Sequence, residues 1–517
     1  MSTAARRKGA RKLRRARRQA QRKLRESQSA RGIRKPSHTT RPNRTSPYET
    51  VEQEQQARRE ALIEEARLIR EQLPILLKEL SQIPDPRKPL LLRHKLTTLM
   101  VYGILMFVLH SGSRRKTNES MSAPAMKEAL QALFPELESI PHHDTLYRLL
   151  ARIDPQRIEK AHVALLRSLI RDKKFVDYLV EGCYLIAIDG TQKMVRRLLP
   201  DDGWLQRQVG AEATRWTQYY VYVLEANLVL SNGVSIPLMS EFLDYREGDN
   251  EGEKQDCEQR AFFRLAQRLK RAFPRLPIML LLDGLFAGGP TMDRCRDYGW
   301  HFMIVLQDGS LPQVWQECEG LSKLLEAEDR LKQRWADREQ SFELFNQIDY
   351  RWGDNDKKHL LIHVALCHES WEEVNGEGTR VSRCGRWAWI SDLPFSRQKV
   401  HVRCNLGGRH RWGIEEGILV EKRQGYDYEH CYALDWNAMC GYHRLMRMAH
   451  LLNVLACHAS TLIEAVKERG AQGFIEWVRG TLSGRWLDPE GLQARLAAPF
   501  QLRLLFPLPE APLVLTG

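Results

Sequence analysis

The sequence has no long uncharged hydrophobic run. The longest, Leu96 to Leu109, has 14 residues, whereas a membrane-spanning helix needs roughly 18 or more. We therefore expect a buried helix there and no association with a membrane. The basic N-terminus lacks the apolar stretch of a secretory signal. The ten cysteines include no C-x-x-C pair, so reduced thiols and a cytoplasmic location are expected.

Acidic residues are nearly missing from the first 44 positions. This segment holds 17 of the 79 Lys and Arg, and its one acidic residue is Glu26. The rest of the chain has 62 basic and 64 acidic residues, so the excess charge lies in this tail. Because the tail repels itself, we expect residues 1–48 to be disordered when free. A polyanion would partner it, with Arg11 to Arg25 forming a helix on binding. Ribosomal proteins and nuclear localisation signals share this composition.

Residues 49–180 have the periodicity of a helical N-terminal domain. One helix is expected from Glu49 to Leu80, and a second helical block runs from Leu90 to about Asp177. Within that block Asp144 or Thr145 would cap a short helix. Such a helix after a turn can enter a DNA groove, although packing against its neighbours is its commoner role.

From residue 181 to 308 the pattern is that of strands and helices in alternation. Strands are expected over 184–188, 219–230, 234–242, 278–282 and 302–306, with a helix from Cys257 to Phe273. Ser231-Asn232-Gly233 predicts a hairpin turn. This order favours an α/β fold with a mixed sheet and flanking helices. We divide the rest into a β-rich insertion (309–400, with a helix over 321–338), a helical part (401–470) and a small C-terminal appendage (471–517).

Two aspartates each end an apolar strand and precede a glycine. They are Asp189 and Asp283, and carboxylates at strand ends are good oxygen ligands for Mg²⁺. Asp-Gly is also an ordinary turn, and Asp308-Gly309 has the same pattern. The pattern alone therefore does not select the functional residues.

A third motif, Arg411-Trp412-Gly413-Ile414-Glu415, continues to Lys422. On a helix, Arg411 and Lys422 would lie within about 40° of Glu415, on one face. A surface stripe of ion pairs would have the same spacing.

Taken together, these motifs resemble the DDE transposases of bacterial insertion sequences. The match is to the cut-and-paste group marked by Y-x2-R-x3-E-x6-K, and it covers roughly residues 84–450, with a β-rich insertion before the glutamate. One position departs from the signature, because Gly408 stands where the tyrosine would be. If that position is equivalent, a tyrosine there is expected to strengthen binding of DNA ends.

The resemblance implies an RNase H-like catalytic core in which Asp189, Asp283 and Glu415 are catalytic and hold two Mg²⁺ ions, with Mn²⁺ as a substitute. Arg411 and Lys422 would contact DNA phosphates. Trp412 would either stack on a displaced base or lie in the core. Implied partners are the terminal inverted repeats, the target DNA and a second copy of the chain on paired ends. The implied setting is the bacterial nucleoid.

The implied activity is DNA transposition, with metal-dependent cleavage at the element ends and joining of 3′ ends to a target. A related nuclease that cuts without joining is one alternative. A domesticated DNA-binding protein without strand transfer is another, and the presence of all three carboxylates argues against an inactive core.

Overall fold

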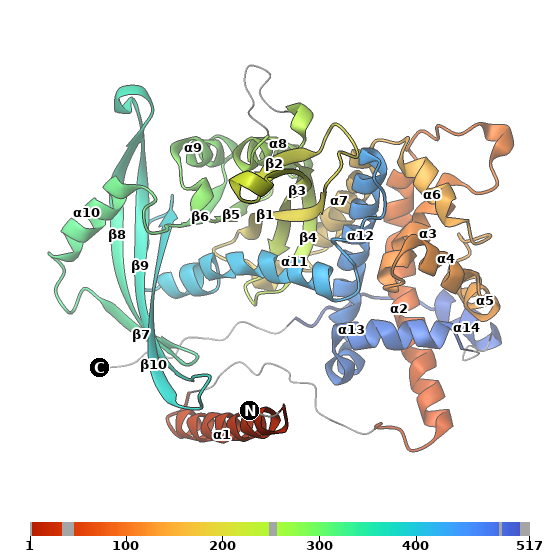
Figure 1. Cartoon of the computed structure of the whole chain (residues 1–517), viewed down its shortest axis with the longest axis horizontal. Helices are drawn as coiled ribbons and strands as arrows, with labels where there is room; N and C mark the ends of the chain where they lie inside the picture. The colour runs from red at the N-terminus through yellow and green to blue at the C-terminus, as the bar shows by residue number, and fades with distance from the viewer. Residues whose placement is uncertain (1–2, 34–45, 248–255, 485–488, 507–517) are drawn as a thin grey trace.

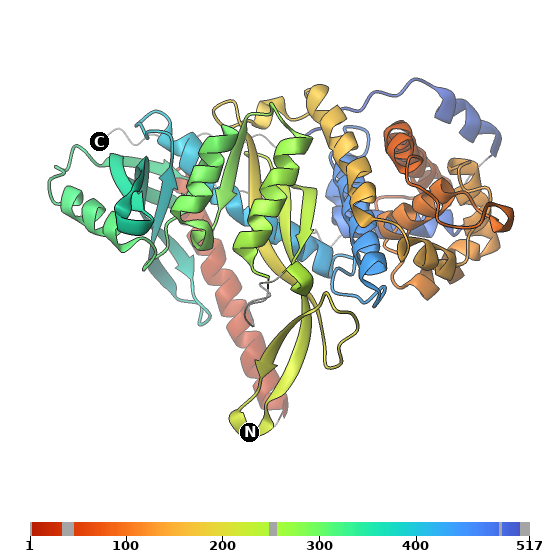
Figure 2. The same cartoon turned by 90° about the horizontal axis from the view of Figure 1, so that it is seen from above.

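The computed structural model describes residues 3–33, 46–247, 256–484 and 489–506. It is a mixed α/β structure in which a large sheet lies beside a helical domain (Figure 1). The long helix α12 (Trp436–Cys457) lies between the two parts in both views (Figures 1 and 2). Within the described residues, none of the helices combines the length and apolar character that a membrane span requires.

The sheet has ten strands in the order β2-β3-β1-β5-β6-β10-β9-β8-β7, and β4 pairs with β3. Its central part consists of β1 (Tyr184–Arg196), β3 (Trp216–Val229), β4 (Ser235–Phe242), β5 (Ile278–Leu282) and β6 (His301–Val305). β1, β5 and β6 are parallel, and β3 runs antiparallel to β1. The strands expected from the sequence are therefore present, and Gly233 turns the β3–β4 hairpin with φ of 89°.

Successive apolar side chains of β1 point to opposite faces of the sheet, so both faces are apolar. Ile186 and Ile188 belong to the core that includes Phe262 and Leu265 of α8 (Glu258–Ala272). Leu185 and Ala187 belong to a second core, with Ile414 and Ile418 of α11 (Gly413–Arg423). Because neighbouring residues of a strand point to opposite faces, α8 and α11 cover opposite sides of the same strands.

The β-rich segment extends this sheet. β10 (Arg380–Ser391) pairs with β6, and β9 (Lys358–Val374), β8 (Arg338–Trp352) and β7 (Leu331–Trp335) follow outward, while β2 (Leu205–Val209) forms the opposite edge. The helix expected over 321–338 is wrong. Helix α10 is Pro312–Ser322, where a proline begins the helix, and residues 331–335 form β7. Helix α9 (Gly289–Tyr298) joins β5 to β6.

The helical domain is built on α2 (Val51–Leu80), which begins at the N-cap Thr50. It continues with α3 (Leu96–Val108), α4 (Arg114–Ser122), α5 (Pro124–Leu133), α6 (His143–Leu150) and α7 (Pro155–Arg171). The apolar run of α3 is buried, as expected. The cap expected at Asp144 or Thr145 is wrong, because His142 is the N-cap of α6 and its Nδ1 accepts the Asp144 N–H at 3.2 Å.

The C-terminal helices return to this domain. Helices α13 (Ile463–Leu482) and α14 (Pro489–Ala497) both contact α2. The guanidinium of Arg58 in α2 lies 5.2 Å from the Trp477 ring, and Arg67 donates to the carbonyl of Pro499 at 2.9 Å. Helices α13 and α14 are therefore packed against the first helix after the basic tail.

The basic tail differs from its expected disorder. Residues Thr3–Ala30 form α1, and residues 34–45 lie outside the described part. Leu24 and Gln28 are buried beside β9, and Arg31 pairs with Glu372 of β9 at 2.6 Å. The helix expected over Arg11 to Arg25 is present, and its apolar Leu24 packs against β9. Its cationic side chains from Lys12 to Arg18 remain exposed.

Candidate active site

The parallel pairing of β1 and β5 brings Asp189 and Asp283 to one edge of the sheet. The parallel register ends at Ala187 opposite Leu281, two residues before each aspartate. Asp283 follows β5 directly, and its Oδ1 accepts the N–H of Leu285 at 3.0 Å. Asp189 does not end its strand, because β1 continues to Arg196 along β3. It ends only the parallel portion, which is the position expected for a ligand site.

Burial and three neighbouring charges act on the Asp189 carboxylate. Burial raises its pKa to about 6, Arg411 opposes that shift, and the charges of Asp283 and Glu415 add to it. Oδ1 accepts the N–H of Gly190 at 2.9 Å. The charges of Asp283, at the end of β5, and of Glu415, on α11, therefore both act on Asp189 of β1. A cation among them would relieve this repulsion.

Glu415 lies in the first turn of α11, and its side chain is 36% exposed. Its Oε1 accepts a hydrogen bond from Arg411 Nη2 at 2.6 Å, and Arg411 Nη1 lies 3.6 Å from Asp189 Oδ2. Arg411 belongs to the 3₁₀ turn η8 (Gly408–Trp412) that leads into α11. The arginine thus bridges two of the three carboxylates.

Arg411 is only 4% exposed, yet its hydrogen-bonding capacity is not used up. Its Nε and Nη1 are buried without a hydrogen-bond partner among the described residues. A buried donor left unpaired costs about 1–3 kcal/mol. The site therefore has donors ready for an oxygen ligand that the chain itself does not supply.

The donor set of the triad is that of a hard divalent cation. The described residues bring three ligand atoms within 4.8 Å of one another only at His142, His143 and Asp144. The carboxylates of Asp189, Asp283 and Glu415 are therefore spread more widely, with the Arg411 guanidinium between two of them. Arg114 lies 3.8 Å from Asp144, which places a competing cation at the His142 cluster.

Trp412 and Lys422 flank this site on η8 and α11. Trp412 is 42% exposed, so the alternative that it is a core tryptophan is wrong. The Arg411 guanidinium stacks on its ring at 4.3 Å. Lys422 Nζ lies 2.9 Å from Glu429 and 3.4 Å from the carbonyl of Gln192, three residues beyond Asp189.

Gly408 occupies a closed space at the start of η8. A Cβ at this position would lie 2.8 Å from the Trp389 ring and 3.0 Å from Met303 Cε. Gly408 is also separated from α11 by the rest of η8, so it is not on the helical face of Glu415. The ring of Trp389, which comes from β10, fills the space beside Gly408.

Glu258, at the first position of α8, is a fourth carboxylate that our sequence analysis missed. A Cβ built on Gly190 would lie 2.6 Å from Glu258 Oε2, which places this carboxylate directly against the residue after Asp189. Burial raises the pKa of Glu258, a hydrogen bond from Tyr222 opposes the shift, and the Asp283 charge adds to it. The only sequence signal was an acidic residue at a helix N-terminus, which is commonplace.

One family model matches part of the chain. Residues 77–166, which contain α3 to α6 and most of α7, match the family model described as "DDE_Tnp_1-associated". No curated protein matches the sequence. Among solved structures, one similar chain is that of a cryo-EM piggyBac transposase synaptic complex with hairpin DNA, with 9% identity and a TM-score of 0.33 over 80% of this chain and 77% of that one. Such a TM-score does not establish a shared fold.

Proposed function

We propose that this chain is a DDE-type transposase of an insertion sequence, which cuts DNA at the ends of its element and joins the 3′ ends to a target. The central strands β3, β1, β5 and β6, with α8 and α11 on opposite faces, form its RNase H-like core. Asp189, Asp283 and Glu415 are the catalytic carboxylates. The match of residues 77–166 to a transposase-associated family model supports this assignment.

The observation that carries the proposal is that one buried arginine contacts two sequence-distant carboxylates, while the charge of a third carboxylate acts on one of them. Up to 226 positions separate Asp189 from Glu415, yet Arg411 contacts both, and the charge of Asp283 acts on Asp189. A surface stripe of ion pairs along α11 would not include Asp189 of β1 and Asp283, which directly follows β5. The arrangement is instead that of a cation site at the carboxyl end of a parallel pair of strands.

The residues fit a pair of Mg²⁺ ions, for which Mn²⁺ would substitute, held by Asp189, Asp283 and Glu415. Bound there, the ions would supply charge stabilisation for phosphoryl transfer and acidify a nucleophilic water or 3′-hydroxyl. Glu258 contributes a further negative charge beside Asp283.

The chain's own cationic groups orient the DNA. Arg411 leaves Glu415 and donates Nη1 and Nε to a phosphate at the cleavage site, which satisfies its buried donors. Trp412 presents an exposed ring beside that arginine for stacking on an unpaired base. The Nζ of Lys422, which donates to the carbonyl of Gln192 in β1, also binds a neighbouring phosphate.

The decisive test is cutting of DNA that flanks the gene, where short inverted repeats are expected. The purified full-length protein is incubated with a labelled duplex from this boundary and Mg²⁺, with EDTA and a scrambled duplex as controls. Metal-dependent cutting at the boundary supports the proposal. Cutting that persists in an Asp189→Asn or Asp283→Asn variant overturns it.

Strand transfer separates a transposase from a nuclease. A pre-cut end with a free 3′-hydroxyl is mixed with a supercoiled plasmid, and joined product is measured on a gel. Joining establishes the transposase. Cutting without joining by the same preparation would leave a nuclease with the same active site.

A further inference from the structure

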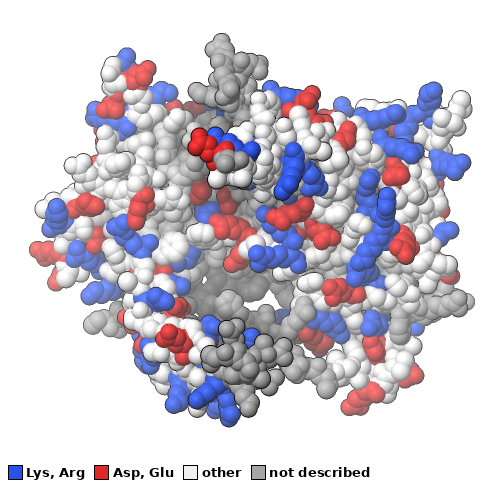
Figure 3. All heavy atoms as spheres, viewed as in Figure 1, with Lys and Arg blue, Asp and Glu red and all other residues white. Residues whose placement is uncertain are grey.

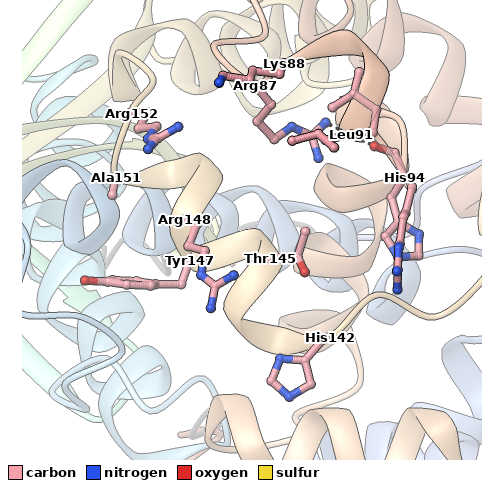
Figure 4. A pocket seen from close by; sticks show the side chains of 12 residues that line it. Arg87, Lys88, Leu91, His94, His142, Thr145, Tyr147, Arg148, Ala151 and Arg152 are labelled. Atoms are coloured by element: carbon pink, nitrogen blue, oxygen red, sulfur yellow. Dashed lines mark hydrogen bonds between the residues drawn. The ribbon is translucent and has the colours of Figure 1, made fainter.

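A groove in the helical domain lies between the 3₁₀ turn η1 (Pro89–Leu91) and α6, at a distance from the candidate active site. It has a volume of about 770 Å³. Figure 4 shows Thr145 and Arg148 of α6, with Arg152 just beyond the end of the helix, on one side and Arg87, Lys88 and Leu91 on the other. The groove therefore joins two segments within the part of the chain that matches the family model, residues 77–166.

All the charged residues that line this groove are basic. They are Arg87, Lys88, Arg93, Arg148 and Arg152. Arg87 is paired with Asp85 at 2.6 Å. The other four are exposed, and none of them has a carboxylate partner within 4 Å among the described residues. Elsewhere on the face in Figure 3, Lys and Arg are interspersed with Asp and Glu, so a lining of one sign indicates an anionic occupant.

Helix α6 is fixed so that its basic face points outward. Leu146, Leu149 and Leu150 are buried on its other face. Leu146 packs close to Gly103 of α3, and Leu150 packs close to Gly441 of α12. Thr145 and Arg148 follow the three-residue spacing of one helix face, and Arg152 lies in the turn directly after α6. Arg148 is thus presented on a short helix that packs against its neighbouring helices, with Arg152 just beyond its end.

Two exposed leucines, Leu91 and Leu92, line the opposite wall, and the exposed Leu90 directly precedes them. Leu90 is 99% exposed, Leu91 is 75% exposed, and Leu92 is also exposed. Consecutive exposed apolar side chains at a cationic groove are unfavourable in a free protein and need an occupant with both phosphate and apolar surface. Duplex DNA offers both, because its sugars and base edges lie between two rows of phosphates.

We infer that this groove holds duplex DNA, with Lys88, Arg93, Arg148 and Arg152 on the phosphates and Leu91 against the sugars or base edges. The inference rests on the proposed function, and it assigns to the helical domain a DNA surface separate from the catalytic carboxylates. Under this inference α6 contacts DNA as well as packing against its neighbours. Arg148 on its outward face is exposed, whereas Leu146, Leu149 and Leu150 are buried.

Binding is tested in EDTA, so that cutting cannot interfere. A fluorescein-labelled duplex of random sequence is titrated with the full-length protein, and anisotropy is recorded from low to moderate salt. The test variant is Arg148→Glu/Arg152→Glu. The matched control is Arg157→Glu/Arg167→Glu, which changes two equally exposed arginines of α7 outside the groove.

The groove variant is expected to bind at least about tenfold more weakly at 0.1 M salt, and its log–log salt slope to be shallower by about two. The control variant and Arg148→Lys/Arg152→Lys should stay within about threefold of the native protein. Leu91→Ser should weaken binding without changing the slope, because it removes no charge. Unchanged circular dichroism and melting temperature establish that the variants are folded.

Two failures are distinguishable. If the native protein neither binds nor cuts DNA, the proposed function itself fails. If the native protein binds and cuts but the groove variant matches it in affinity and slope, the groove is not a DNA surface and this inference is overturned. Competition by polyglutamate as strong as by unlabelled duplex, at equal charge, would likewise overturn DNA as the specific occupant.

Discussion

Arg447 of α12 donates hydrogen bonds to both carboxylate oxygens of Glu421 in α11, at 3.0 and 3.2 Å. Both side chains are buried. His450 shares Glu421 Oε1 at 2.7 Å, and a second Arg447 nitrogen donates to Asn227 Oδ1 of β3 at 2.5 Å. The pair therefore ties α11, the helix that carries Glu415, to α12 and to the sheet, which fixes where the Glu415 carboxylate can lie.

Removing one partner of this pair should destabilise the fold. Burial alone would raise the pKa of Glu421, but Arg447 and His450 lower it below its ordinary value. Stability from this carboxylate is therefore present above the unfolded-state pKa of a glutamate and is lost as the pH falls through the lower folded-state pKa. We expect Glu421→Gln to cost up to about 3 kcal/mol, because it leaves the buried Arg447 with Glu225 as its remaining carboxylate partner.

Thermal denaturation at several pH values measures this effect. The control is Glu429→Gln, since the exposed Glu429–Lys422 pair is expected to contribute only about 0–1 kcal/mol. The Glu421 variant should also lose part of the acid sensitivity of the native protein. Equal melting temperatures for the two variants would show that the buried pair does not hold α11.

Glu415 and Glu416 give an adjacent test pair for catalysis. Glu415 contacts Arg411, whereas Glu416 is exposed beside Gly413 and Gly417 on another side of α11. The nearby Arg409 pairs with Glu369 at 2.8 Å and not with Glu416. Glu415→Gln is expected to abolish Mg²⁺-dependent cutting while DNA binding and folding persist, and Glu416→Gln should retain most activity. The reverse result would overturn the assignment of the glutamate.

The sequence predicts local structure well where one strong pattern acts alone. The apolar runs at Ile278–Leu282 and Tyr184–Ile188 and the Asn232-Gly233 turn all lie where periodicity and turn chemistry placed them. Misplaced elements have weaker local signals. Residues 331–335 are charged and helix-compatible, but pairing with β8 makes them a strand. Such long-range pairing is invisible to a local pattern.

In the candidate site, too, some residues could be predicted from the sequence and others could not. Asp189, Asp283 and Glu415 were selected by motifs, and the structure brings their charges together. The place of Glu258 depends on how α8 packs over Gly190, and the filling of the Gly408 position depends on Trp389 of β10. Neither contact could be predicted from residue spacing, because each joins elements that are distant in the chain.

Glu258 should tune how tightly the site holds metal. Its carboxylate lies against Gly190 and acts on the charge of Asp283. Glu258→Gln keeps a hydrogen-bond acceptor for Tyr222 but removes the negative charge, so we expect about a tenfold higher Mg²⁺ concentration for half-maximal cutting. Mn²⁺ binding followed by electron paramagnetic resonance should weaken in parallel. Glu317→Gln on exposed α10 is the control, and an identical metal dependence of the two variants would exclude this role.

The basic N-terminal segment should contribute to DNA affinity through its charge. Deleting residues 1–44 removes 17 cationic side chains, which should weaken DNA binding and make its log–log salt slope shallower. Because Leu24 is buried, the deletion should also cost about 1–2 kcal/mol of stability. Leu24→Ala separates the effects, since it should lower stability and leave the slope unchanged. A slope that survives the deletion would mean that the segment does not contact phosphates.

Gly408 is the last position that distinguishes this chain from the signature it resembles. Our expectation from the sequence, that Gly408→Tyr would strengthen end binding, conflicts with the space available, because even a Cβ would lie 2.8 Å from Trp389. We expect Gly408→Ala to cost about 1–3 kcal/mol and Gly408→Tyr to cost more, since overpacking forces the backbone or the neighbouring ring to move. Displacing Trp389 would also shift η8, and with it Arg411, so cutting should fall along with stability.

A compensating variant tests whether space is the reason. Trp389→Leu alone removes volume and should destabilise the core, whereas Gly408→Tyr combined with Trp389→Leu should be more stable than the sum of the two single effects predicts. Gly376→Ala is the control, because nothing lies within 4 Å of a Cβ at that exposed position. Thermal denaturation of the set, followed by Mg²⁺-dependent cutting, measures both consequences. If Gly408→Tyr is as stable as the native protein and binds DNA ends more tightly, then Trp389 yields to the tyrosine and the position is equivalent to that of the signature after all.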